Sequence, residues 1–209
     1  MEGRYATATR DDQRYRSEKS GGRGETDTWL YLSLCERDLA AASRAAAALP
    51  PSGMFTDGIN FPRTFCNGLV ARLSGDIPMA QKAFEDARTE VEAVVRAQPD
   101  YGPPICVLGM IDAALGRKED AIREGKRAVE LLPVDRDAIN GIHIMKHLAV
   151  TYAWSGEKDR AIDQIMTTLR LPTDLSYGQL KLHPFWDALR DDQRFEKIVA
   201  DLAPKAGSP

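Results

Sequence analysis

The sequence predicts an all-α fold, a solenoid of about four helix hairpins that ends in a C-terminal capping helical segment. A glycine is followed five residues later by an alanine in three places, and an arginine replaces the glycine in a fourth. Each of the last three blocks closes on a proline, with an aspartate one or two residues further on. Stacked helix pairs build extended surfaces, so this periodicity favours binding over catalysis. The four instances are Arg37…Ala42, Gly75…Ala80, Gly116…Ala121 and Gly156…Ala161.

The chain divides into a lead-in, four repeats and a tail. Residues 1–25 are polar, and we expect them to be disordered. The apolar periodicity predicts helix pairs within residues 26–172, with Met54–Phe61 as a loop that turns at Asp57-Gly58. Residues 173–203 carry dense apolar anchors and predict the capping segment, and residues 204–209 are expected to be disordered. The four expected repeats span residues 26–53, 61–99, 102–133 and 142–172.

Composition excludes several classes of function. The 209 residues are 43% hydrophobic and 28% charged, with a formal net charge of −3 and no basic block in the repeats. We therefore expect no nucleic-acid partner. No apolar run reaches the roughly 18 residues of a membrane span, and no apolar stretch follows the N-terminal charges, so we expect neither a membrane partner nor a signal peptide. The cysteines, Cys35, Cys66 and Cys106, give no disulfide framework, which favours a cytoplasmic location.

The repeats resemble tetratricopeptide repeats over roughly residues 26–172. The family pattern has Leu-Gly and Tyr in the first helix, Gly at the turn, then Ala, a large residue, Ala and a closing Pro. This chain departs from it with Asp112 in place of Tyr, Gly125 in place of the large residue, Ala149 in place of Gly and Thr168 in place of the later Ala. The resemblance implies a right-handed solenoid that binds proteins or peptides. The matching residues are Gly68, Gly75, Ala80, Phe84 and Ala87; Leu108, Gly109, Gly116, Ala121, Ala128 and Pro133; and Leu148, Tyr152, Gly156 and Ala161.

The tail is similar to a segment that ends many bacterial repeat proteins. Residues 184–195, Pro-Phe-Trp-Asp-Ala-Leu-Arg-Asp-Asp-Gln-Arg-Phe, match its usual form except that Ala188 and Gln193 replace two prolines. Such tails often belong to longer chains that begin with a serine/threonine kinase, a DNA-binding domain or a cyclase-type domain. The likeness implies an alternative function, a regulatory region separated from a signalling enzyme or a transcriptional regulator.

Motifs for catalysis are absent, and we expect no enzyme, no catalytic residue and no cofactor. The sequence contains neither a phosphate-binding glycine loop nor kinase signatures. His143 and His147 have the i, i+4 spacing of a metal pair, but the glutamate of the His-Glu-x-x-His motif is missing. We expect no metal site and interpret both histidines as groove or surface residues, with a metal-dependent enzyme as the weakest hypothesis.

The inward positions of the resembled family predict the binding surface. Carried over, they imply an apolar groove with a few basic points, suited to a peptide or protein segment. The alternative is that these side chains only pack against neighbouring helices. We expect a non-enzymatic interaction scaffold whose oligomeric state the sequence leaves open. The predicted groove residues are Tyr31, Leu34, Phe65, Leu69, Arg72, Cys106, Met110, His143, Lys146, Val150 and Trp154.

Overall fold

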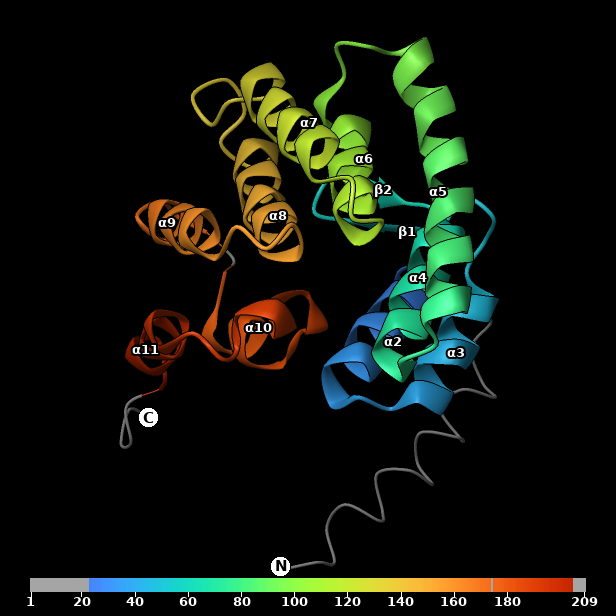
Figure 1. Ribbon diagram of the computed structural model, residues 1–209, viewed down its shortest axis with the longest axis horizontal. Helices are drawn as coiled ribbons and strands as arrows, with labels where there is room; N and C mark the ends of the chain where they lie inside the picture. The colour runs from blue at the N-terminus through green and yellow to red at the C-terminus, as the bar shows by residue number, and fades with distance from the viewer. Residues whose placement is uncertain (1–22, 174, 205–209) are drawn as a thin grey trace, which may run out of the picture.

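The computed structural model describes residues 23–173 and 175–204, and it is predominantly helical, as predicted (Figure 1). The first described helix begins at Arg23, so residues 23–25 of the expected lead-in are helical; the rest of the lead-in and residues 205–209 lie outside the described residues. The helices are α2 (Arg23–Glu36), α3 (Leu39–Ala48), α4 (Arg63–Ser74), α5 (Ile77–Ala97), α6 (Gly102–Ala114), α7 (Lys118–Leu131), α8 (Asn140–Trp154), α9 (Lys158–Leu169), α10 (Tyr177–Leu182), the 3-10 helix η1 (Pro184–Leu189) and α11 (Gln193–Asp201).

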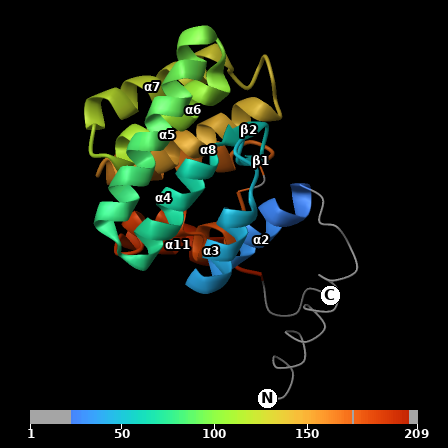
Figure 2. The ribbon, with the colours of Figure 1, turned by 90° about the vertical axis from the view of Figure 1, so that its right-hand side faces the viewer.

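Between residues 23 and 169 the long helices pair in chain order, α2 with α3, α4 with α5, α6 with α7, and α8 with α9. Neighbouring pairs pack through α3 with α4, α5 with α6, and α8 with both α6 and α7. Figure 2 shows the first pair and the C-terminal tail, residues 175–204, on the same side of the molecule. The chain thus curves so that its last elements approach its first helix.

The turn inside each pair has the same backbone geometry. Gly75, Gly116 and Gly156 have φ values of 78°, 75° and 78°, and Arg37 has a φ of 60° at the equivalent place. In each turn the next residue donates its backbone N–H to a carbonyl five residues earlier, over distances of 2.8 to 3.0 Å. These bonds satisfy carbonyls that a helix end would leave unpaired. The weak first repeat therefore folds its turn as the other three do.

Arg37 provides a test of that equivalence. A left-handed backbone disfavours residues with a Cβ atom, and β-branched residues most. Arg37→Gly and Arg37→Val both lose the ion pair with Asp187, so the loss of that contact cancels when the two variants are compared. We expect the glycine variant to be about 2 kcal/mol more stable than the valine variant, as measured by urea unfolding. Equal stability would show that this turn is not left-handed in solution.

The alanine after each turn lies where the two helices of a pair meet. Ala42, Ala80, Ala121 and Ala161 are all at most 6% exposed. In the third pair the contact is closest, because a Cβ atom at Gly109 would lie 3.0 Å from the Ala121 carbonyl oxygen. Small residues at these positions therefore permit the close approach of α6 and α7.

Substitution of Gly109 should separate α6 from α7. We expect Gly109→Val to lower the free energy of unfolding by about 2 kcal/mol, because the obstructing atoms are backbone and cannot rotate away. Gly178→Val is the matched control, since a Cβ atom there would have no neighbour within 4 Å. We expect that control to stay within about 0.5 kcal/mol of the parent protein. A Gly109→Val protein as stable as the control would contradict the close packing.

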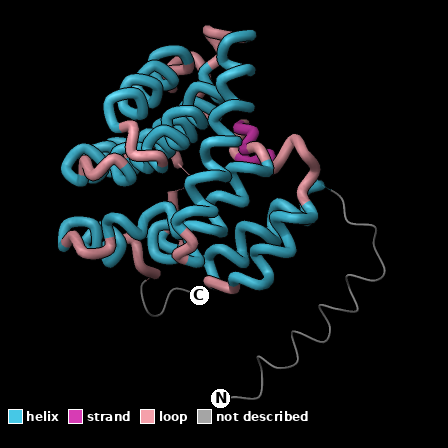
Figure 3. Tube along the Cα trace, turned by 45° about the vertical axis from the view of Figure 1, so that its right-hand side comes forward, coloured by secondary structure: helices cyan, strands magenta, loops and turns pink. Residues whose placement is uncertain are grey.

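The expected loop at residues 54–61 is instead a β-hairpin, seen beside the helices in Figure 3. Strands β1 (Met54–Thr56) and β2 (Ile59–Phe61) are antiparallel. Asp57 and Gly58 form the two-residue turn, with φ values of 56° and 70°. Positive φ at both central positions matches the right-handed twist of the strands, which is why Asp-Gly suits such turns. The hairpin packs through β2 against α6.

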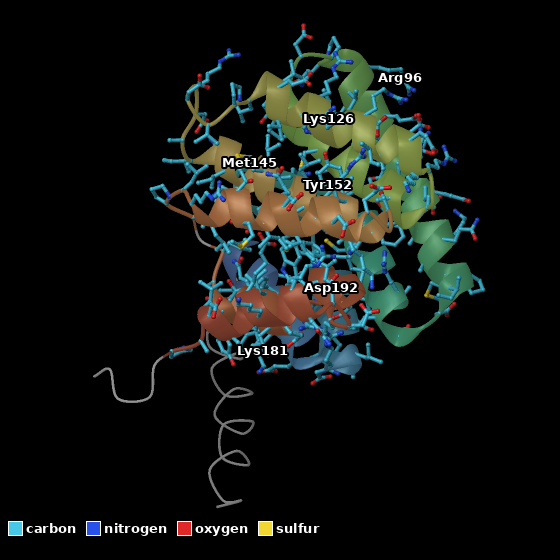
Figure 4. The ribbon with its side chains drawn as sticks, turned by 60° about the vertical axis from the view of Figure 1, so that its left-hand side comes forward. Arg96, Lys126, Met145, Tyr152, Lys181 and Asp192 are labelled. Atoms are coloured by element: carbon cyan, nitrogen blue, oxygen red, sulfur yellow. The ribbon has the colours of Figure 1, made fainter. Side chains whose placement is uncertain are left out.

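The tail packs against both ends of the repeat array. Figure 4 shows it beside α9, where Lys158 contacts Asp191 at 2.5 Å and Arg194 contacts Asp159 at 2.7 Å. At the other end, the Arg37 guanidinium donates two hydrogen bonds of 2.6 Å to Asp187. The tail thus covers the last pair, as a cap would, and also reaches back to α2.

Candidate functional site

A pocket of about 380 Å³ is lined by residues of α2, α4 and α8, each of which is the first helix of its pair. The β-hairpin and the tail supply its remaining walls. A pocket of this size accommodates a compact ligand or a few residues of a peptide. Elements far apart in sequence therefore converge on one cavity.

Helix α2 contributes Asp27, Tyr31 and Leu34 to the pocket wall. Their i, i+4, i+7 spacing places them on one helix face. The Asp27 Oδ2 atom accepts a 3.3 Å hydrogen bond from the Phe55 N–H, which ties α2 to the hairpin. The Oδ1 atom of Asp27 is buried and accepts no hydrogen bond among the described residues.

The opposite wall is formed by α8 with the hairpin turn. Lys146, only 6% exposed, donates a 2.6 Å hydrogen bond from Nζ to Asp57 Oδ2. His143 Nδ1 lies 3.9 Å from the same oxygen. A buried ion pair is retained only with good geometry, since both charges lose water. This contact joins residues 89 positions apart and fixes the hairpin over α8.

Aromatic side chains of the tail close the pocket. The rings of Tyr31 and His183 stack with centroids 5.1 Å apart, and Phe185 meets His183 edge-on at 4.2 Å. Trp154 donates its indole N–H to the Phe185 carbonyl at 3.0 Å. These contacts hold the tail against both α2 and α8.

Both histidines of the pocket are neutral at neutral pH. Burial, reinforced for His147 by the Lys146 charge and for His183 by His147, lowers the pKa of each to about 3. His147 Nδ1 donates to the His143 carbonyl at 2.7 Å, because a carbonyl only accepts. His183 Nδ1 accepts from the Phe185 N–H at 3.3 Å, so its proton is on Nε2.

The predicted groove residues separate into three groups. Tyr31, Leu34, Leu69 and Lys146 line the pocket. His143, Arg72 and Trp154 lie near it, with the Arg72 guanidinium 4.3 Å from the Trp154 ring centroid. The remaining four are buried among helices, which matches the packing alternative. These are Phe65, Cys106, Met110 and Val150.

Residues of the hairpin and the tail line the pocket together with the helices. Asp27, Asp57, His183 and Phe185 were not among the predicted site residues, yet all line the pocket. The Asp57-Gly58 dipeptide is a hairpin signal that could have indicated part of this wall. No local pattern places the tail beside α2.

A second buried polar cluster lies between α5, α6 and α7. The Asp112 side chain is fully buried and its Oδ1 accepts a 2.6 Å hydrogen bond from Arg88 Nε. Glu124 is next to it, and burial together with the Asp112 charge raises the pKa of Glu124 to about 8. At neutral pH the Glu124 carboxyl is therefore protonated and has a proton to donate, and the buried Asp112 Oδ2 accepts no other hydrogen bond among the described residues. Asp112, at the usual tyrosine position of the resembled pattern, thus takes part in a polar network.

The described residues contain neither a metal-binding cluster nor a membrane-spanning helix. Within residues 23–173 and 175–204, no three His, Cys, Asp or Glu side chains are grouped as a metal site would require. In that same part of the chain, no helix combines the length and apolar character needed to cross a membrane. Comparison with protein-family models, curated proteins and solved structures finds no match.

Proposed function

We propose that this chain is a non-enzymatic binding module, a right-handed solenoid of tetratricopeptide-type hairpins whose inner pocket holds a segment of a partner peptide or protein. The pocket itself carries the proposal, because five structural elements converge on it with both apolar and polar side chains. Ligand sites typically combine such walls with a few placed polar groups.

The repeated turn geometry supports the tetratricopeptide assignment. Each turn combines a left-handed residue with the same backbone hydrogen bond, followed by a buried alanine. Gly109, the glycine of the Leu-Gly pair in the resembled pattern, lies where α6 and α7 approach closely. Helix pairs of this kind commonly provide inner surfaces for recognition.

Selection from a random peptide library tests the proposal. Gln179 is half-buried and lines the pocket, so Gln179→Trp should fill it. Lys181→Trp is the matched control, because Lys181 is exposed on the same helix and does not line the pocket. We expect peptides selected on the parent protein to bind the control equally and to lose at least about tenfold in affinity for Gln179→Trp.

Thermal unfolding of both variants must first show that they fold. Selected peptides that bind folded Gln179→Trp and the parent equally would place recognition outside the pocket. Failure to select any peptide would contradict peptide binding itself.

A further inference from the structure

We propose that the pocket recognises an organic cation, an amine carried on an apolar body, through the Asp27 carboxylate and the aromatic side chains around it. This inference rests on the proposed function and specifies the chemistry of the group that enters the pocket. In a peptide partner, that group is a lysine side chain or an N-terminal amine.

The first support is the charge balance of the lining. Among the described residues that line the pocket, the formally charged groups are Asp27, Asp57 and Lys146. Lys146 and Asp57 form an ion pair of 2.6 Å, and thereby neutralise each other. The two lining histidines, His147 and His183, carry no charge at neutral pH, so the formal charge of the described lining residues is −1.

The second support is the spare hydrogen-bonding capacity of Asp27. A carboxylate accepts about four hydrogen bonds, yet the described residues supply one, the 3.3 Å contact from the Phe55 N–H. Its Oδ1 atom is buried without a donor, an arrangement that is unfavourable until a donor is supplied. An ammonium group that reaches this carboxylate would supply a donor that the described residues lack.

The third support is the number of aromatic side chains that line the same pocket as Asp27. Tyr31 lies one helical turn after Asp27 on the same face of α2, and Phe55 provides the backbone donor to Asp27. Phe61, Phe185 and Trp186 also line the cavity. Aromatic faces attract cations and accept apolar groups, so they suit an amine with a hydrocarbon body.

An anionic ligand is disfavoured by the same arrangement. Its natural partner would be Lys146, whose ammonium group is already engaged by Asp57. Binding through Lys146 would therefore require breaking a buried ion pair, and it would place a second negative charge near Asp27.

Calorimetry with three indole probes of similar shape tests this inference. The probes are tryptamine, which is a cation, indole-3-propionate, which is an anion, and indole-3-ethanol, which is neutral. We expect tryptamine to bind at least about tenfold more tightly than indole-3-propionate. We expect Asp27→Asn, which keeps an acceptor for the Phe55 N–H, to reduce the affinity for tryptamine about tenfold and to leave indole-3-ethanol within about twofold. Asp100→Asn, a change at an exposed turn, should leave all three affinities unchanged.

Three results would overturn the inference. They are equal or tighter binding of the anion, an unchanged tryptamine affinity in Asp27→Asn, and no detectable binding of tryptamine. None of them decides the proposed function, which depends on peptide selection. Selected peptides that need the pocket but contain no amine there would uphold the proposed function and exclude the amine.

Discussion

Acidification from pH 7 to pH 4 is expected to lower the free energy of unfolding by about 3 kcal/mol for each of His147 and His183. A pKa that differs by one between the folded and the unfolded chain corresponds to about 1.4 kcal/mol. Both side chains are buried, at 2% and 6% exposure, and both have a pKa of about 3 in the folded protein, against 6.5 for an ordinary histidine. The unfolded chain therefore takes up protons below pH 6.5 that the folded chain refuses. Their stabilising contribution is complete above pH 6.5 and is lost as the pH falls towards 3.

The measurement is urea unfolding at both pH values for the parent and for His147→Gln/His183→Gln. The double variant lacks the two titrating groups. Between pH 7 and pH 4 its free energy of unfolding should therefore fall by about 6 kcal/mol less than that of the parent protein. Comparison with the variant cancels the contributions of other titrating groups. Parallel losses in the two proteins would show that these histidines are accessible to protons in the folded state.

For Glu124 we expect the opposite pH dependence, a loss of stability as the pH rises. Its carboxyl has a pKa of about 8 in the folded protein because it is buried beside Asp112, whereas an ordinary glutamate has 4.5. The folded chain thus keeps a proton that the unfolded chain has lost, so stability falls as the pH rises from about 4.5 to about 8. Between pH 5 and pH 8 we expect the loss to be about 3 kcal/mol.

Glu124→Gln isolates this contribution, because the amide can donate to Asp112 at every pH. We expect the variant to lack this pH dependence and to be more stable than the parent at pH 8. Glu119→Gln, at an exposed site in the first turn of the same helix, is the control and should follow the parent. If the stability of the parent protein and of Glu124→Gln changed equally between pH 5 and pH 8, Glu124 would not hold a proton in the folded protein.

Much of the fold could be predicted because its signals are local. The glycine and alanine spacing located the three turns. The Asp76 carboxylate caps α5, because it accepts a 3.0 Å hydrogen bond from the Met79 N–H. The β-hairpin was missed although Asp57-Gly58 encodes its turn, because strands of three residues give too short an alternating pattern. Short strands are specified mainly by tertiary contacts, here with α6.

The candidate site was less predictable because it depends on contacts between distant segments. Family spacing placed Tyr31 and Lys146 on the inner side, and both line the pocket. The spacing within a repeat does not indicate which of the predicted groove residues are covered by segments from elsewhere in the chain. The contact of Arg37 with Asp187 spans 150 positions, and no periodicity within one repeat encodes it. The closing of the groove by the tail is therefore a property of the whole chain.

The most direct test of the central claim is a crystal structure of the protein with its tightest selected peptide. We expect a segment of the peptide to lie in the pocket between α2, α8 and the tail, in contact with Tyr31 and His183. A peptide bound on the outer surface of the second helices, with the pocket unchanged, would contradict it.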